Sequence, residues 1–463
     1  MFDKEIYSRR RKQLRESMQK GVVVFLSNNE SPMNYPNNTY RYRQDSTFNY
    51  FYGLQMPGLA GIVDLDEGKD ILFGDDFTID DIIWMGNQPA VSELAAKCGI
   101  SLVQPFADFS EYVKKAMNAG RKIHFLPPYR PDNKIFLHKL LGIALDDLKE
   151  NASVELIKAV VALRSIKQPE EIAELEKACN WGAIMHQIAM KACKAGKIER
   201  ELAAYAEAIA LMEGNGVSFP VILSQNGETL HNHNHEQVLE EGRLLLIDAG
   251  VEHTSGYSSD YTRTIPVSGK FTDKQREIYE IVLQANMESI AMAKPGIRYF
   301  DVHLNATTVI AKGLTKLGLM KGSPEEAAKV GAHALFMPHG LGHMLGLDVH
   351  DMEDFGEDYV GYDEHTQRST IFGHRSLRCG RELKTGFVLT VEPGIYFIPQ
   401  LIDIWEKEGK FTDYINYAKV REYIGFGGIR IEDDILITED GCRVLGNPLP
   451  KTVEEIEEVM NNE

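Results

Sequence analysis

Two predominantly apolar stretches of the chain run directly into an acidic residue. Residues 244–247 are followed by Asp248, and residues 388–391 are followed by Glu392. Short apolar runs of this kind predict buried strands, and a carboxylate at the end of a buried strand needs a partner. Three further polar residues lie in short distinctive motifs: Asp260 in SSDYTRT, His343 in HGLGH and Glu432 in RIEDD. A fold for this chain must therefore supply partners for several buried carboxylates.

These five residues together suggest a pair of metal ions. Four carboxylates gathered in a low-dielectric cleft carry a prohibitive charge unless cations cancel it. Carboxylates with one imidazole suit hard or borderline divalent ions. Two such ions close together need bridging carboxylates, and they activate a bridging water for hydrolysis at neutral pH. The sequence therefore predicts a dinuclear metalloenzyme.

Each of the five residues has a simpler interpretation when it is taken alone. An aspartate after a strand is usually a cap or turn residue, a histidine near glycines is usually a loop or core residue, and Glu432 alone could be a cross-strand partner. The metal hypothesis depends on the five side chains meeting at one place.

Bulk properties exclude some classes of partner. A chain of 463 residues predicts two or three domains. The balance of 50 basic to 68 acidic residues gives a net charge of −18, which argues against nucleic-acid and anionic-membrane partners.

The cysteines and the N-terminal residues favour a cytoplasmic protein. The five cysteines are odd in number and contain no CxxC pair, which is typical of free thiols in a reducing compartment; they are Cys98, Cys179, Cys193, Cys379 and Cys442. The basic run at residues 9–11 is followed by an apolar stretch of only residues 22–26, which is too short for a signal peptide.

The pattern of residues 1–162 predicts a mixed α/β domain. A basic helix is expected near residues 4–19, and strands are expected at 21–26, near 60–65 and near 121–126. The remainder, 163–463, is expected to form one large α+β domain.

Three helix starts are predicted in the second domain. Gln168-Pro169 opens a helix with acidic residues in its first turn. Thr272 with Gln275, and Thr452 with Glu455, have the spacing of capping boxes. Residues 351–377 and 399–424 are polar, aromatic and irregular, and are expected to be loops at the rim of the site.

Local spacing supports convergence at the predicted site. Arg430 and Glu432 are two residues apart in a strand-like pattern, so both should point to the same face, where Arg430 can orient a ligating carboxylate. Gly340, Gly342 and Gly346 should let the backbone around His343 approach the site closely.

The ordered motifs DAG, DYTRT, HGLGHMLGLDVHD, VEPGIYF and RIEDD resemble those of the pita-bread metallopeptidases. Within that family the chain is similar to the proline-specific branch, which comprises Xaa-Pro aminopeptidase (aminopeptidase P) and Xaa-Pro dipeptidase (prolidase). The resemblance extends to YRYRQDSTFNYFYG at residues 40–53. It implies an α+β fold, with a pita-bread catalytic domain that has a pseudo-twofold repeat around a curved antiparallel sheet. A smaller α/β RNase H-like domain would precede it.

The resemblance implies a metal-ligand set by position. Asp248 would bind one metal ion, while Asp260 and Glu432 would bridge two. His343 and Glu392 would complete the shell of the second ion, and Glu392 would also carry a proton from the attacking water to the leaving nitrogen.

The resemblance also implies substrate contacts. His231 matches a histidine that contacts the substrate near the scissile bond. His339 and His350 match two more site-lining histidines, one of which would stabilise the oxyanion. Arg378 in RSLR matches a prolidase arginine that holds the substrate's terminal carboxylate, and Tyr396 follows the VEPG motif as in relatives.

One spacing differs from the family pattern. Asp248 and Asp260 are 12 residues apart, where the family usually has 11, and the extra residue falls in a predicted hairpin turn that tolerates an insertion. In the tract HNHNH at 231–235, only His231 falls at a family position. The other residues of that tract are expected to be exposed strand or turn residues.

The resemblance implies an Xaa-Pro aminopeptidase, which hydrolyses the bond between an N-terminal residue and a following proline. DYTRT and YRYRQDS favour this activity. RSLR, FMPHGLGH and the long insertion before RIEDD favour the alternative, an Xaa-Pro dipeptidase restricted to dipeptides. A non-catalytic, protein-binding relative is a remote alternative, because such relatives have generally lost the metal ligands, whereas this chain has all five. The expected cofactors are two divalent ions, Mn²⁺ before Co²⁺, Zn²⁺ or Fe²⁺, and the expected assembly is a homodimer or higher oligomer.

Overall fold

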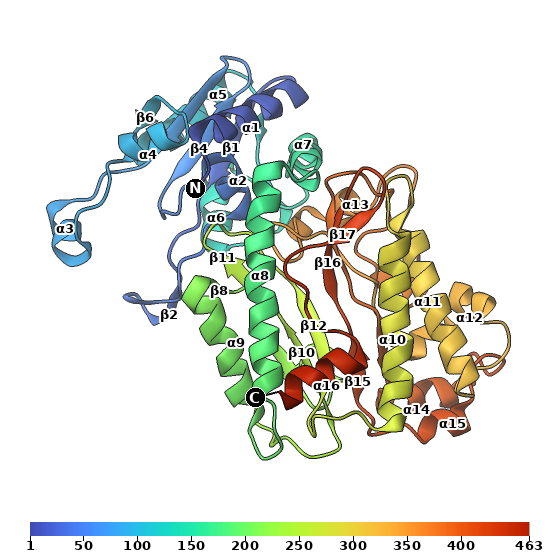
Figure 1. Ribbon diagram of the computed structural model, residues 1–463. Coiled ribbons are helices and arrows are strands. Elements are labelled where there is room, and N and C mark those ends of the chain that lie inside the picture. Colours follow the sequence, from blue (N-terminus) through green and yellow to red (C-terminus); the bar gives the residue numbers. More distant parts are fainter. Residues whose placement is uncertain (463) are drawn as a thin grey trace. The chain divides into compact units, whose positions relative to one another are not determined.

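The computed structural model describes residues 1–462, which form two compact units (Figure 1). The first unit contains residues 1–164 and the short segment 354–359. The second contains residues 165–353 and the described chain from residue 360 onward. Among the described residues, no helix has both the length and the apolar character needed to cross a membrane.

A five-stranded mixed sheet forms the centre of the first unit. Its strand order is β6-β5-β4-β1-β7, with two antiparallel pairs (β1–β4, β4–β5) and two parallel pairs (β1–β7, β5–β6). The strands are β1 (Val22–Leu26), β4 (Ala60–Asp64), β5 (Lys69–Phe73), β6 (Leu102–Gln104) and β7 (Ile123–His124). A separate hairpin pairs β2 (Pro32–Tyr35) with β3 (Asn38–Thr39). The three strands predicted in this half of the chain are confirmed as β1, β4 and β7.

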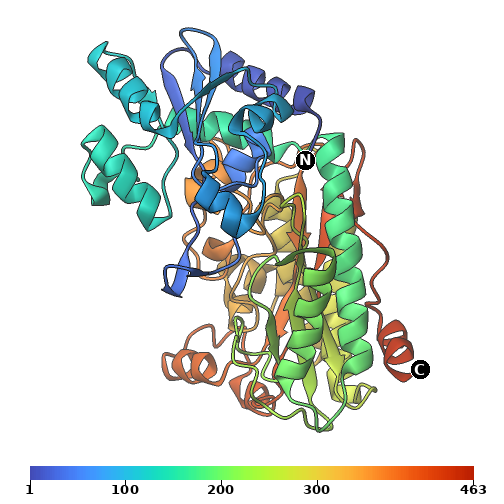
Figure 2. The ribbon, with the colours of Figure 1, turned by 90° about the vertical axis from the view of Figure 1, so that its left-hand side faces the viewer.

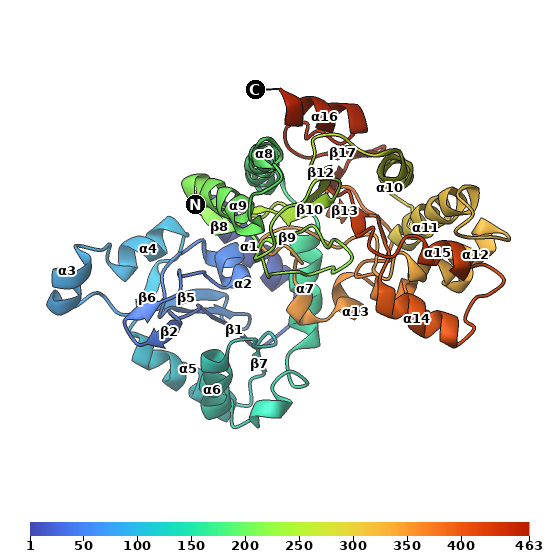
Figure 3. The same cartoon turned by 90° about the horizontal axis from the view of Figure 1, so that it is seen from below.

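Helices cover both faces of this sheet, as Figures 2 and 3 show. Every residue of β4 is buried, as expected for a strand whose two faces are both packed. The helices are α1 (Lys4–Ser17), α2 (Ser46–Tyr52), α3 (Ile79–Met85), α4 (Val91–Lys97), α5 (Phe106–Asn118), α6 (Pro131–Leu141) and α7 (Val154–Ser165), with a 3-10 turn η1 (Leu145–Asp147). The predicted basic helix near 4–19 is confirmed as α1.

The second unit uses one plan twice: a pair of long helices followed by antiparallel strands. The first copy comprises α8 (Pro169–Ala192), α9 (Glu199–Glu213), β8 (Gly214–Val217), β9 (Ile222–Ser224), β10 (Leu244–Ala249), β11 (Val251–His253) and β12 (Tyr261–Pro266). The second comprises α10 (Asp273–Met292), α11 (Tyr299–Lys316), β13 (Val388–Val391), β14 (Gly394–Tyr396), β15 (Gly428–Arg430), β16 (Asp433–Ile437) and β17 (Cys442–Val444). The strands lie between the α8/α9 pair and the α10/α11 pair (Figures 1 and 3).

Short elements connect or follow the two copies. They are α12 (Pro324–Val330), η2 (Ala332–Leu335), η3 (Glu353–Phe355), α13 (Glu357–Val360), η4 (His374–Ser376), α14 (Pro399–Lys407), α15 (Tyr417–Arg421) and α16 (Val453–Asn461).

The strands of the two copies meet at one backbone bridge. The first copy forms a sheet with the order β12-β10-β9, and the second forms one with the order β13-β16-β17. An antiparallel bridge joins Thr262 of β12 to Glu432, and the Glu432 N–H donates to the Thr262 carbonyl at 3.0 Å. Two of the acidic motifs are thereby brought to the same place.

The predicted helix starts are confirmed. Helix α8 begins at Pro169 with Glu170 and Glu171 in its first turn. The Thr272 side chain accepts from the Gln275 N–H, and Gln275 returns the bond to the Thr272 N–H at 2.9 Å. The Thr452–Glu455 pair caps α16 in the same way.

Two expectations about local structure were wrong in part. Residues 399–424 were expected to form a loop, but α14 and α15 lie there. Helix α14 starts at Pro399, which suits the first turn of a helix, and buries Ile402 and Trp405 at helical spacing. The strand expected through RIEDDILIT is interrupted between β15 and β16, and the interruption contains Glu432.

Candidate active site

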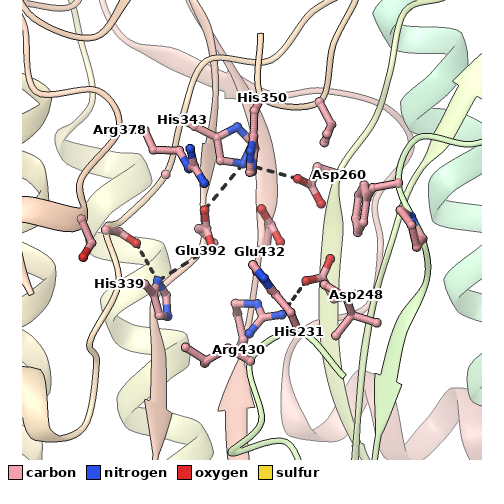
Figure 4. Close-up of a pocket in the computed structure, with 18 of the residues that line it drawn as sticks. His231, Asp248, Asp260, His339, His343, His350, Arg378, Glu392, Arg430 and Glu432 are labelled. Carbon is pink, nitrogen blue, oxygen red and sulfur yellow. Dashed lines mark hydrogen bonds and ion pairs between the residues drawn. The ribbon is translucent and has the colours of Figure 1, made fainter. Parts of the chain in front are cut away.

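The five residues of the predicted metal set all line one cavity of about 410 Å³ in the second unit (Figure 4). His231, His339, His350, Arg378 and Arg430 line the same cavity. Tyr396 does not belong to the wall. It is fully buried and reaches the site through hydrogen bonds to His339 and Arg430.

Strand pairing and hydrogen bonds from backbone N–H groups position the acidic motifs. Asp248 lies in β10, where its register partner on β12 is Thr262. Asp260 directly precedes β12, and its N–H donates to Asp434 Oδ2 at 2.9 Å. Glu392 directly follows β13, and its N–H donates to the Leu341 carbonyl at 2.8 Å. Asp248 and Glu392 are thus positioned at strand ends, as the apolar runs before them predicted.

His343 is held by β13 and needs the glycine beside it. The His343 N–H donates to Thr390 Oγ1 at 3.1 Å. A Cβ on Gly342 would lie 2.1 Å from the Thr390 carbonyl oxygen, so no other residue fits there without moving the strand. The expectation that glycine allows this close approach is confirmed.

The unprotonated nitrogen of the His343 imidazole faces two carboxylate oxygens. Its Nδ1 lies 3.1 Å from the Met344 carbonyl, which can only accept, so Nδ1 carries the proton of the neutral ring. Its Nε2 lies 3.5 Å from Asp260 Oδ2 and 3.7 Å from Glu392 Oε1. Three acceptors that face one another in this way repel unless a cation or a proton lies between them.

Two buried oxygens at the site have no hydrogen-bond partner among the residues that the structure describes. They are Oδ1 of Asp248 and Oδ1 of Asp260. Ligand atoms of Asp260, His343 and Glu432 also lie within 4.8 Å of one another. Buried acceptors without donors are costly, and a carboxylate-rich set with one imidazole is suited to divalent cations. The residues present therefore fit a metal centre.

The electrostatics of the cavity agree with this interpretation. Burial, and then the charges of neighbouring acids, raise the pKa of Asp260 and the pKa of Glu432 well above their ordinary values. Burial also raises the pKa of Glu392, although His343 and Arg430 oppose that shift. Without further positive charge these carboxyl groups hold protons more strongly than usual, and bound cations would relieve their mutual repulsion.

Arg430 provides the positive charge nearest to Asp248. Its guanidinium donates to Asp248 Oδ2 at 2.5 Å, to Thr262 Oγ1 at 3.0 Å and to the Tyr396 hydroxyl at 2.8 Å. The Tyr396 hydroxyl in turn lies 3.0 Å from His339 Nε2. Because His339 Nδ1 faces the Gly340 carbonyl at 2.7 Å, the ring accepts the tyrosine proton at Nε2. Both nitrogens of His339 are therefore occupied.

A second polar group at the wall is organised by Glu353, a residue that the sequence did not single out. Glu353 Oε2 lies 2.7 Å from His350 Nδ1, and Oε1 accepts from Arg378 Nη1 at 2.5 Å. The bond to His350 and the charge of Arg378 lower the pKa of Glu353 to about 2 although burial opposes the shift, so Glu353 is ionised at neutral pH.

Other wall residues were also missed. His233 was expected to be an exposed turn residue; it is exposed, but it lines the cavity. Its position depends on the path of the 226–236 loop, which no local pattern encodes. The apolar part of the wall has no sequence signature either, and consists of Phe219, Pro220, Ile222, Leu230 and Val349.

Comparisons with known proteins place the chain among peptidases. The sequence model of metallopeptidase family M24 matches residues 173–439, and that of the aminopeptidase P N-terminal domain matches residues 7–124. An Xaa-Pro aminopeptidase of Escherichia coli is 32% identical over 99% of this chain and 98% of its own length. An Xaa-Pro dipeptidase of Homo sapiens is 31% identical over 96% of this chain and 90% of its own length.

A solved structure supports the same relationship. The structure of E. coli aminopeptidase P with the inhibitor Pro-Leu matches with a TM-score of 0.80 and 30% identity, and the match covers 99% of this chain and 98% of that chain. The expected fold class, a pita-bread catalytic unit with an N-terminal domain of the aminopeptidase P type, is confirmed by this match.

Proposed function

Because this chain belongs to metallopeptidase family M24, we propose that it is an Xaa-Pro aminopeptidase. It hydrolyses the bond between an N-terminal residue and a following proline. The observation that carries the catalytic part of the proposal is the cavity in which buried carboxylate oxygens and the Nε2 lone pair of His343 face one another without donors. The preference for proline rests on the similarity to Xaa-Pro aminopeptidases and Xaa-Pro dipeptidases.

The metal ligands of the proposed centre are Asp248, Asp260, His343, Glu392 and Glu432, which would hold two divalent ions. When bound, these ions supply the positive charge that the carboxylates need and activate the attacking water. A carboxylate-rich set favours Mn²⁺, with Co²⁺, Zn²⁺ and Fe²⁺ as the alternatives.

The protein's own groups carry the proton. Glu392 reaches the cavity from the end of β13, and its raised pKa suits a group that accepts a proton from water and returns it to the proline nitrogen. Since both nitrogens of His339 are occupied, His339 is assigned to positioning through Tyr396. His231 and His350 are assigned to direct contact with the substrate, close to the developing oxyanion.

The Arg378–Glu353 pair favours an aminopeptidase over a dipeptidase. A dipeptide carries its free carboxylate on the proline residue. In dipeptidases of this type, the arginine that Arg378 matches would bind that carboxylate. Here Glu353 already accepts a hydrogen bond from Arg378 at 2.5 Å, so a protein carboxylate occupies that side of the guanidinium. A longer peptide does not need to displace it.

Further properties follow from the same proposal. The boundary between the N-terminal and catalytic domains is placed at residues 162 and 163, two residues before the division between the two compact units. The five cysteines are free, which supports a reducing, cytoplasmic environment. A homodimer or higher oligomer is proposed for the assembly, with no nucleic acid or membrane as partner.

A panel of Xaa-Pro dipeptides and Xaa-Pro-Yaa tripeptides, assayed with Mn²⁺, tests the activity. We expect efficient release of the N-terminal residue from the tripeptides. Hydrolysis of the dipeptides with negligible tripeptide cleavage would replace the proposal with the Xaa-Pro dipeptidase alternative. No cleavage of either class by fully metal-loaded protein would favour a non-catalytic, protein-binding relative.

A further inference from the structure

Three histidines far apart in sequence form a second, fully buried cluster in the catalytic unit. His303 lies on α11, His333 in η2 and His374 in η4, and their exposed fractions are 0%, 0% and 1%. One nitrogen of each ring lies within 4.8 Å of those of the other two. None of the three lines the cavity of the proposed active site.

The hydrogen bonds of the cluster determine the tautomers of two rings. His333 Nδ1 lies 3.0 Å from the Ala328 carbonyl oxygen, and His374 Nε2 lies 2.9 Å from the same oxygen. A carbonyl only accepts, so both of these nitrogens carry protons. The lone pairs are therefore on His333 Nε2 and His374 Nδ1.

The cluster is not satisfied by its own hydrogen bonds. His303 Nε2 lies 2.9 Å from His374 Nδ1 and donates its proton to that lone pair. Within the described part of the chain, this leaves His303 Nδ1 and His333 Nε2 buried without a hydrogen-bond partner. Two orphaned imidazole nitrogens in one buried cluster are costly, and they indicate that something else is bound there.

We propose that His303, His333 and His374 form a third metal site, which takes a zinc-like borderline divalent cation. Three imidazoles without a carboxylate suit Zn²⁺, Ni²⁺ or Cu²⁺, whereas Mn²⁺ and Mg²⁺ prefer oxygen ligands. Ligand nitrogens about 2.0–2.1 Å from zinc lie roughly 3.3 Å apart in a tetrahedral shell. His303 Nε2 lies 2.9 Å from His374 Nδ1, and one nitrogen of each ring lies within 4.8 Å of those of the other two. The spacing of the rings is therefore compatible with the roughly 3.3 Å of a tetrahedral shell.

The hydrogen-bond partners of the cluster are of the kind that orients metal-binding histidines. Metal-binding histidines usually donate their second N–H to a carbonyl or carboxylate, and two rings of the cluster do so to Ala328 in the last turn of α12. The third ring, that of His303, can bind the cation through Nε2 if its proton moves from Nε2 to Nδ1. Helices α11 and α12, which carry His303 and Ala328, lie side by side (Figures 1 and 3).

All three rings are neutral at neutral pH, as metal binding requires. Burial lowers the pKa of His333 to about 3, and burial with the neighbouring rings lowers the pKa of His303 well below its ordinary value. Burial also lowers the pKa of His374. Neutral imidazoles bind a cation without releasing protons at neutral pH.

A glycine allows the third ligand to reach the others. Gly373 has a φ of +89°, and a Cβ there would lie 2.6 Å from the Ala334 Cβ and 3.1 Å from His333 Nε2. The turn that carries His374 therefore packs directly on the cluster. Ser376 is the last residue of that turn and Arg378 follows two residues later; both line the active-site cavity, so a bound ion would anchor that wall to α11 and η2.

Zinc binding to an active-site variant tests the proposal without an activity assay. The Asp260→Asn/Glu432→Gln double variant lacks two ligands of the carboxylate centre. Circular dichroism first establishes that this variant is folded. Titration of this protein with Zn²⁺ should give one tightly bound zinc per chain, with an X-ray absorption spectrum dominated by imidazole nitrogen. Added Mn²⁺ should not displace it.

Substitutions in the cluster complete the test. His333→Asn and His374→Asn, each in the double-variant background, should abolish this zinc. His365→Asn changes a histidine in the same 351–377 segment whose side chain is 83% exposed, and it should leave binding intact. No tight zinc in the double variant, zinc retained by both cluster variants, or a carboxylate-dominated absorption spectrum would each overturn the proposal. The absorption spectrum decides even if the cluster variants fail to fold, and none of these results depends on the peptidase activity.

Discussion

Arg430 donates to Oδ2 of Asp248 over 2.5 Å and leaves the other oxygen of that carboxylate, Oδ1, buried without a partner. One oxygen is thereby fixed by the protein and the second is left for a cation. This division explains how a buried arginine can stand beside a metal centre: it orients a ligand and offsets part of the negative charge.

Replacement of Arg430 should weaken the centre without unfolding the protein. In Arg430→Lys, an ammonium cannot reach Asp248, Thr262 and Tyr396 at once. Metal affinity and kcat should fall roughly 10- to 100-fold, as measured by Mn²⁺ titration and peptide hydrolysis. Arg298→Lys, which changes an exposed pair with Asp301, is the matched control. Wild-type metal affinity in Arg430→Lys would rule out the orienting role.

Removal of the Glu353 charge should change the preference for substrate length. In Glu353→Gln, Arg378 loses its ion pair with Glu353 and becomes more available to the carboxylate of a dipeptide. The ratio of kcat/KM for Xaa-Pro dipeptides to that for tripeptides should rise a few-fold, in line with about 1 kcal/mol for a partly exposed ion pair. The double variant Glu353→Gln/Arg378→Ala should lose this gain. An unchanged ratio in the single variant would show that the pair does not control length.

The Tyr396 hydroxyl connects Arg430 to His339, so its removal should cost both stability and rate. Tyr396→Phe leaves a buried guanidinium N–H and a buried imidazole nitrogen without their partner, at about 1–3 kcal/mol. The urea midpoint and kcat should both decrease. Tyr205→Phe, at a tyrosine with 43% exposure, should change neither. A fully stable and fully active Tyr396→Phe would contradict the hydrogen-bond chain described above.

Acid stability should depend on Asp433, which is buried against Arg263 at 2.6 Å and Lys451 at 2.7 Å. Although burial opposes ionisation, these two cations lower its pKa from 3.8 to about 2. A lowered pKa means that the ionised pair stabilises the fold fully above about pH 4 and loses that contribution as pH falls towards 2. The shift corresponds to about 2 kcal/mol.

Urea unfolding at several pH values checks this prediction. The stability difference between the wild type and Asp433→Asn should be largest above pH 4 and should shrink as pH falls towards 2. Asp403→Asn, at an aspartate with a 62% exposed side chain, should show no such trend. A difference that stays constant from pH 6 to pH 2 would mean that the Asp433 carboxylate does not act through its charge.

Much of the site was predictable because its signals are local. Asp248 and Glu392 follow apolar runs that are buried strands, and a strand end determines where the next side chain points. The capping boxes at Thr272 and Thr452 are likewise encoded within four residues. The ordered motifs then linked these local signals to a known family.

The rest depends on tertiary contacts that leave no local pattern. Glu353 matters because it lies between His350 and Arg378, which are 28 residues apart in sequence. The cluster of His303, His333 and His374 has no metal-binding spacing, because its ligands come from a helix and two separate turns. Helix α14 was missed because it is only nine residues long and its buried residues, Ile402 and Trp405, span less than one helical turn.

The decisive measurement is the number of Mn²⁺ ions per chain, determined together with activity, because Mn²⁺ favours the carboxylate centre over the histidine cluster. Activity should reach its maximum as the second Mn²⁺ binds, and Glu432→Gln should fail to retain two ions and should be inactive. Full activity with one ion or fewer per chain, or two ions held normally by Glu432→Gln, would contradict a dinuclear centre built by these five residues.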